Sequence, residues 1–319
     1  MHSFNKITEY FDSFVMPLLR SQYGDILPNM SIMILGSVGL GNDDELSDLE
    51  VGIYLCDSDW KQFGKEIQLS LNRLMRNNNP WQEKGSVLCV HPTSWLLDGQ
   101  AHKFFEGKDN LLLEDVSFET LFTVQNNLIV FDQQELLHKL RDKTAPANYP
   151  DKLWRKSLLV VFKNIIEELH ELEDSVLRNE IVEAFGSFGR IIEELYRIGF
   201  IASRNYYPWR SHLSWAFEKL LLASDFKHLI NEALAADTWQ KRLEHIKNMT
   251  DAYKEYIKAN DLLPGIDLCA PSLEDELLWA ERCKAWENPN WRDYITTCTK
   301  KAVDAGHTEK DFWVFSLWG

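Results

Sequence analysis

The stretch MSIMILGSVGLGNDDELSDLEV, residues 30–51, decides the fold of the N-terminal part of this chain. It opens with an apolar run at 30–35, which is typical of a buried strand that ends at Gly36-Ser37. Glycine, asparagine and aspartate continue the turn as far as Asp43. A second apolar run follows at 49–55. The pattern therefore predicts two strands that are joined by a glycine-rich turn.

Strand and helix patterns alternate around this stretch. Apolar residues at helical spacing predict three helices, over 5–22, 58–76 and 117–126. Short apolar runs predict two more strands, at 86–91 and 128–131. Residues 143–150 carry two prolines and no periodicity, which is typical of a linker.

Beyond the linker the pattern changes to long helices. Apolar spacing predicts helices over 152–172, 176–203 and 209–223, one or two more over 225–260, and a mostly helical, tryptophan-rich C-terminal segment. We therefore expect an α+β domain at 1–142, a linker at 143–150 and an all-helical bundle domain at 151–319.

Composition limits the classes of function. The chain has 319 residues, 45% of them apolar and 26% charged, which excludes a disordered chain and makes two domains the natural expectation. The net charge is −15. An acidic chain of this kind is poorly suited to non-specific binding of nucleic acid or of an anionic membrane, because both need a cationic surface.

The sequence also carries signals about location. No apolar run reaches the ~18–20 residues of a membrane span, and no basic start followed by an apolar stretch marks a secretory signal. The five cysteines are far apart and form no CxxC pair. We expect reduced thiols in a cytoplasmic protein, with neither a disulfide framework nor a zinc site.

The chemistry of the opening stretch lies in two carboxylates beside the turn. Asp48 and Glu50 are two residues apart on the predicted second strand, so their side chains leave the same face. Mg²⁺ takes carboxylate oxygens and fills its other positions with water and phosphate. The Ser37 hydroxyl and the backbone N–H groups of the turn would lie close to phosphate oxygens, and Gly36 would let the backbone approach them. The pattern predicts a magnesium–phosphate site.

Gly36-Ser37, a spacer of 48 − 37 = 11 residues and then Ser47-Asp48-Leu49-Glu50 resemble the signature of the nucleotidyltransferase superfamily related to DNA polymerase β. Within this superfamily, the sequence of the stretch is most similar to that of the bacterial antibiotic nucleotidyltransferases, which adenylylate lincosamides and aminoglycosides. Residues 196–215 resemble, more loosely, a helical segment that follows such a domain in an uncharacterised bacterial family. The resemblance implies a polymerase β-like domain, a mixed sheet with flanking helices, before the helical bundle.

The resemblance also implies an activity and its site. It is the transfer of a nucleoside monophosphate, AMP from ATP, to a hydroxyl of a small molecule such as an aminoglycoside- or lincosamide-like antibiotic. Two Mg²⁺ ions would be held by Asp48 and Glu50. Gly36 and Ser37 would bind the β- and γ-phosphates. In the helical half, Arg204 and Asn205 are expected to face the nucleotide or the substrate.

The expected partners are therefore a nucleoside triphosphate and a small acceptor bound between the domains, with no nucleic acid and no membrane. The oligomeric state stays open. A carboxylate from either domain would act as general base, with Glu106, Glu183 and Glu193 as candidates.

Two departures from the signature support an alternative. The second metal carboxylate is normally aspartate, and this chain has Glu50. A third carboxylate normally lies on a later strand, and the run at 86–91 carries Cys89 and His91 instead. The alternative is a catalytically degenerate nucleotidyltransferase-fold protein that acts as a nucleotide-binding or regulatory module. A third hypothesis, one half of a toxin–antitoxin pair, is disfavoured by the fused helical domain.

Overall fold

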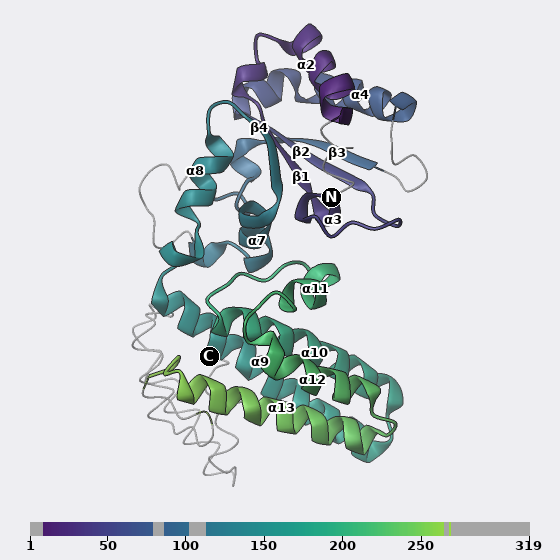
Figure 1. Cartoon of the computed structure of the whole chain (residues 1–319), viewed down its shortest axis with the longest axis vertical. Coiled ribbons are helices and arrows are strands. Elements are labelled where there is room, and N and C mark those ends of the chain that lie inside the picture. The colour runs from purple at the N-terminus through teal and green to yellow at the C-terminus, as the bar shows by residue number, and fades with distance from the viewer. Residues whose placement is uncertain (1–8, 79–85, 102–112, 265–267, 269–319) are drawn as a thin grey trace. The chain divides into compact units, whose positions relative to one another are not determined.

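The computed structural model describes residues 9–78, 86–101, 113–264 and 268. The chain divides into two compact units between Asn148 and Tyr149 (Figure 1). Each unit has its own core, and the two are described in turn.

The first unit is built on a four-stranded mixed sheet with the strand order β3-β2-β1-β4. Its strands are β1 (Ser31–Leu35), β2 (Leu49–Leu55), β3 (Ser86–Pro92) and β4 (Leu128–Asp132). β1 runs antiparallel to both β2 and β4, whereas β3 is parallel to β2. In this register Leu35 of β1 lies opposite Glu50 of β2.

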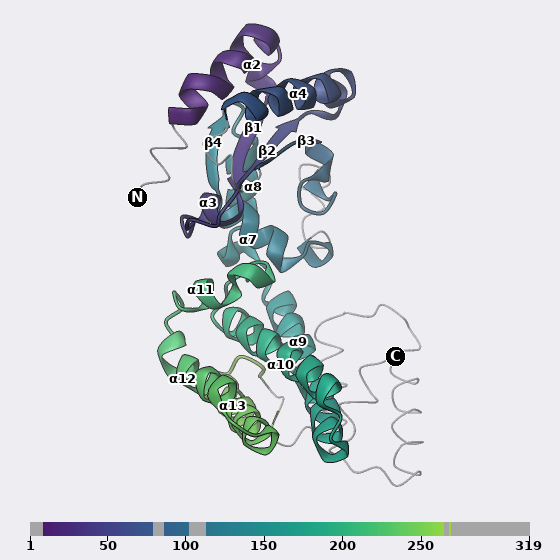
Figure 2. The ribbon, with the colours of Figure 1, turned by 90° about the vertical axis from the view of Figure 1, so that its right-hand side faces the viewer.

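Helices flank this sheet. They are the π-helical turn η1 (Phe11–Val15), α2 (Met16–Tyr23), α3 (Gly36–Leu40), α4 (Asp57–Asn78), α7 (Phe118–Asn126) and α8 (Leu136–Lys143). Short 3₁₀ turns lie at Leu27–Asn29, Thr93–Trp95, Leu113–Asp115 and Pro146–Asn148. Figure 2 shows α2 and α4 packed together beside the strands. Their apolar side chains, such as Leu19 and Leu71, form the core with Ile34, Val51 and Ile53.

The second unit is helical throughout the part of it that the structure describes. It contains α9 (Asp151–Arg178), α10 (Ile181–Ala202), η6 (Arg210–His212), α11 (Leu213–Phe217), α12 (Ala223–Ala235) and α13 (Trp239–Ala259). Helix α9 ends at Asn179, which has a left-handed φ of 59°, and α10 follows at once. The core of the unit contains Phe217 and Tyr253, and the Phe226 ring stacks on Tyr253 at 4.0 Å.

The predicted fold class, α+β with a mixed sheet and flanking helices before a helical region, is confirmed. All four strands lie within one residue of their predicted bounds. The predicted linker contains the last residue of α8 and the 3₁₀ turn at Pro146–Asn148. None of the helices among the described residues is both long and apolar enough to cross a membrane.

Several local predictions were wrong. The turn after β1 is a short helix, α3, and helix α8 was not predicted. The helix predicted from 176 begins at Ile181, because the left-handed Asn179 ends α9 first. The helix predicted over 209–223 is replaced by a 3₁₀ turn, the short α11 and the first residue of α12. The prediction of one or two helices over 225–260 is confirmed by α12 and α13. The predictions for 5–8 and 269–319 lie outside the described residues.

Candidate functional site

Strand β2 separates an apolar face of the sheet from a polar one. Its alternate residues are almost completely buried in the core: Leu49, Val51, Ile53 and Leu55. Glu50, Gly52 and Tyr54 lie on the opposite face, and Asp48, just before the strand, continues the same alternation. The structure thus brings the two predicted metal ligands to one face at the start of β2.

The turn after β1 places Gly36 directly against Glu50. Gly36 has a φ of +61°, which side-chain-bearing residues rarely adopt. A Cβ at Gly36 would also collide with the Glu50 carboxylate oxygen Oε2. The backbone conformation therefore favours glycine, a Cβ here would displace the Glu50 carboxylate, and two of the predicted site residues are in contact.

Helix α3 holds this turn against the sheet. A Cβ at Gly39 would collide with the Ile34 carbonyl oxygen of β1 and would lie 2.5 Å from Asn127 Oδ1. The helix ends at Gly41, whose φ of +70° is left-handed. Ser37, the second residue of α3, is half-buried, and its carbonyl accepts the Asn42 N–H at 3.0 Å. The predicted phosphate-binding residues thus lie in a closely packed turn.

The acidic groups on this face interact electrostatically. Burial raises the pKa of Glu50, and the negative charge of Asp48 raises it further. On the neighbouring strand, burial raises the pKa of the Cys89 thiol, with a further contribution from Glu50. Negative charge is therefore unfavourable at this end of the face, and a bound cation would relieve the repulsion.

A row of polar and aromatic side chains continues along the same face. The Tyr54 hydroxyl lies over Gly52, where a Cβ would be 2.7 Å from it, and burial, followed by Cys89, raises the pKa of Tyr54 to about 12. The His91 ring lies 6.0 Å from the Tyr54 ring and 5.2 Å from that of Trp95. Sequence reasoning missed Cys89 as a neighbour of both Glu50 and Tyr54, because its position depends on the pairing of β3 with β2.

The donors on this face suit one magnesium ion. Mg²⁺ is often held by one or two carboxylates together with substrate phosphates, and thiols are poor ligands for it. Asp48 and Glu50 supply such a carboxylate pair. Throughout the described parts of the chain, no group of three His, Cys, Asp or Glu side chains could hold a metal ion. Glu106, a candidate for the general base, lies outside those parts.

Arg204 and Asn205 lie in the second unit, where they end helix α10. Arg204 has a left-handed φ of 54°, and the Asn205 N–H donates to the Phe200 carbonyl at 2.9 Å. The Arg204 guanidinium forms an ion pair with Asp151 at the start of α9 and lies 5.9 Å from the Trp154 ring. Arg204 thus joins α10 to α9, whereas Asn205 caps the end of α10.

The remaining base candidates differ in their surroundings. Glu183 is exposed on α10. The Glu193 side chain is only 11% exposed, and its carboxylate is paired with Arg197 at 2.7 Å and with Arg210 at 2.6 Å. The Glu193 carboxylate is thus engaged by two guanidinium groups of its own unit.

Comparison with known proteins gives two matches. A family model described as "Domain of unknown function (DUF4037)" matches residues 114–215. No curated protein matches the sequence. Among solved structures, the chain is similar to a nucleotidyltransferase-like protein from Exiguobacterium sibiricum 255-15, at 10% sequence identity over 92% of each chain and with a TM-score of 0.41.

Proposed function

We propose that this chain is a nucleotidyltransferase that transfers a nucleoside monophosphate, AMP from ATP, to a hydroxyl group of a small molecule. The observation that supports it is the contact between the Glu50 carboxylate and the Gly36 backbone, with Asp48 on the same face of β2. A nucleoside triphosphate needs both a backbone that phosphate can approach and carboxylates for its magnesium ion. These two requirements meet at this turn.

In this proposal Asp48 and Glu50 hold Mg²⁺, and Gly36 and Ser37 contact the β- and γ-phosphates. Bound magnesium would supply charge neutralisation for the phosphate oxygens during an in-line displacement. Burial and Asp48 disfavour the ionised form of Glu50, so Glu50 has more to gain from a cation than a solvated glutamate would. Tyr54 keeps its proton at neutral pH and serves as a wall of the site.

The proposed acceptor is a cationic small molecule such as an aminoglycoside- or lincosamide-like antibiotic. The net charge of −15 supports it, because an acidic protein attracts cationic ligands. Arg204 and Asn205 are proposed to face the nucleotide or the acceptor. The proposed location is the cytoplasm, in keeping with the free thiols of Cys56 and Cys89.

A second candidate function is a nucleotide-binding or regulatory module without transferase activity. The observation that favours it is Cys89, a thiol near Glu50 on the strand that carries the third carboxylate in the nucleotidyltransferase superfamily this chain resembles. Such a protein would bind Mg²⁺–ATP through Asp48 and Glu50 and would release no pyrophosphate.

Two measurements separate these functions. Calorimetry with Mg²⁺–ATP should show binding that Asp48→Asn removes and that Glu45→Gln, an exposed acid in the preceding loop, leaves unchanged. Pyrophosphate release in the presence of a panel of aminoglycosides and lincosamides should occur in the wild type and fall at least about 100-fold in Asp48→Asn.

Each outcome decides between the candidates. Binding without pyrophosphate release favours the regulatory module, and recovery of turnover in Cys89→Asp would identify the missing acid as the cause. If Mg²⁺–ATP does not bind, or if Asp48→Asn binds it as the wild type does, both functions are wrong.

A further inference from the structure

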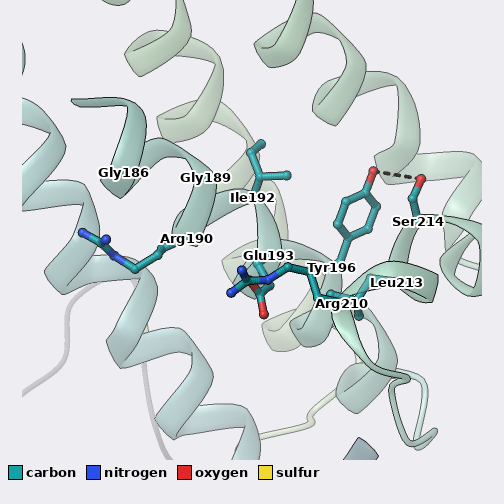
Figure 3. Close-up of a pocket in the computed structure, with 9 residues that line it drawn as sticks. All are labelled: Gly186, Gly189, Arg190, Ile192, Glu193, Tyr196, Arg210, Leu213 and Ser214. Carbon is teal, nitrogen blue, oxygen red and sulfur yellow. Dashed lines mark hydrogen bonds and ion pairs between the residues drawn. The ribbon is translucent and has the colours of Figure 1, made fainter. Parts of the chain in front are cut away.

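The second unit contains a pocket of about 570 Å³, within the usual range for small-molecule sites. It lies between α10 and the η6–α11 segment, so it belongs wholly to this unit (Figure 3). Its lining consists of Gly186, Gly189, Arg190, Ile192, Glu193, Tyr196, Arg210, Leu213 and Ser214. Apart from Glu193, a candidate for the general base, none of these residues has a part in the proposed transferase reaction.

Arg210 is held in place by a buried carboxylate. Its Nε atom pairs with Glu193 at 2.6 Å, and the side-chain exposures are 79% for Arg210 and 11% for Glu193. Figure 3 shows the two groups together in the middle of the lining. The other carboxylate oxygen of Glu193 is taken by Arg197. The Arg210 side chain is largely exposed, so the anchored guanidinium still presents N–H donors to a ligand.

Arg190 repeats this arrangement at another part of the lining. Its Nε atom pairs with Glu168 at 2.5 Å, and its Nη2 atom donates to Ser187 Oγ at 3.1 Å. The Arg190 side chain is 56% exposed, against 22% for Glu168. Both arginines are therefore oriented by less exposed carboxylates. A guanidinium fixed in this way loses little entropy when it binds a carboxylate or phosphate.

The floor of the pocket is open helix backbone. A Cβ at Gly189 would meet no atom within 4 Å, and one at Gly186 would meet only the Arg190 guanidinium, at 3.4 Å for Nη1. Neither glycine has a positive φ. Glycine inside a helix is less stable than alanine, and nothing in the described part of the chain requires glycine here. A flat group could rest on this backbone beside Ile192.

We propose that this pocket binds a small organic anion that carries a flat ring. The carboxylate or phosphate of the ligand pairs with Arg210, with Arg190 as a second donor, and the ring lies over Gly189 against Ile192 and Leu213. A cation is disfavoured, because both oxygens of Glu193 are already paired with arginines. The Tyr196 hydroxyl, which bonds Ser214 Oγ at 3.4 Å, adds a polar edge. The site is independent of the proposed transferase activity.

The test uses four naphthalene probes that share a ring and differ in charge. These are 2-naphthoate, 2-naphthyl phosphate, neutral 2-naphthamide and 2-naphthylmethylammonium, each titrated by calorimetry into the full chain in EDTA. We expect at least one anion to bind, and the amide and the ammonium to bind at least about tenfold more weakly. The two anions distinguish a carboxylate ligand from a phosphate ligand.

Variants locate the binding. Arg210→Ala should weaken the anion about tenfold, whereas Arg178→Ala, an exposed arginine paired with Asp174 on α9, should not. Gly189→Leu should remove binding by filling the pocket, and Asn231→Leu, an exposed position on α12, should leave it unchanged. Circular dichroism checks folding, and Gly189→Ala replaces Gly189→Leu if the latter does not fold.

Three results would overturn this proposal: neither anion binds, the ammonium binds as well as the anions, or Arg210→Ala and the Gly189 variant both bind like the wild type. Asp48→Asn should bind the anions as the wild type does. Failure of this pocket is therefore separable from failure of the proposed transferase.

Discussion

Two pairs of glycines occupy the two units of this protein for different physical reasons. At Gly36 and Gly39 an added Cβ would collide with atoms of the chain itself. At Gly186 and Gly189 it would enter open space or meet only the Arg190 guanidinium. The fold favours glycine at the first pair. At the second pair glycine makes the helix less stable than alanine would, but it leaves room for a ligand.

This difference separates two kinds of site. In the first unit the candidate nucleotide site and the packing of β1, α3 and β2 share the same atoms, so most changes there affect folding as well as binding. In the second unit the pocket lies between α10 and the η6–α11 segment, and its two glycines are exposed, so a change at these glycines can leave the core intact. Substitutions at the two pairs of glycines should therefore have different effects on stability.

The largest effect is expected for Gly39→Ala. The new methyl group would collide with the Ile34 carbonyl and with Asn127, and backbone atoms cannot move as easily as a side-chain end. We expect a loss of about 2–3 kcal/mol in the free energy of unfolding of the first unit, typical of an overpacked site. The midpoint of urea unfolding measures this loss of stability. An unchanged midpoint would mean that α3 does not pack on β1 as described.

Gly36→Ala should cost less stability, about 1–2 kcal/mol, because the positive φ is strained and Glu50 must move away. Mg²⁺–ATP binding should weaken as well. Gly41→Ala is the matched control: it carries the same kind of backbone strain at φ +70°, but its Cβ would meet nothing within 4 Å. If calorimetry shows equal affinity loss in both variants, the contact with Glu50 has no role in binding.

Gly189→Ala should raise the free energy of unfolding, whereas the two substitutions above should lower it. Because the site has helical backbone and open space, alanine should stabilise the second unit by about 0.5–1 kcal/mol. Thermal unfolding followed by circular dichroism measures the shift. A destabilised variant would show that something outside the described contacts already occupies the space over Gly189.

The smallest effect is expected for the pH dependence at Glu50. Its folded pKa is raised above the ordinary 4.5, so ionisation destabilises the fold as pH rises through that pKa, and the wild type regains stability as pH falls. Glu50→Gln should thus be more stable than the wild type at pH 7, by less than about 1 kcal/mol, and equal to it near pH 4.

Magnesium provides the control for this last comparison. Added Mg²⁺ should raise the unfolding temperature of the wild type more than that of Glu50→Gln, because the ion binds the carboxylate only in the folded state. An equal response of the two proteins would argue against Glu50 as a ligand.

Local patterns were enough to predict much of the first unit. The runs at 31–35 and 49–55 are apolar and short, so their strands were predictable, and period-two alternation placed Asp48 and Glu50 on one face. Helix α3 was misjudged as a turn, because glycines disfavour a helix in isolation and only packing on β1 stabilises it. In the helical half, the boundary between α9 and α10 depended on one left-handed asparagine.

Local sequence patterns are enough to predict the strands, the acidic pair and the glycines beside it, because these depend on neighbours within a few residues. Tertiary structure alone decided that Glu50 touches Gly36, that Cys89 joins the same face, and that Arg210 reaches Glu193. Those contacts depend on strand register, on the parallel pairing of β3 and on the return of the chain after α10. Pairings between distant segments are set by how whole elements pack, which no local pattern specifies.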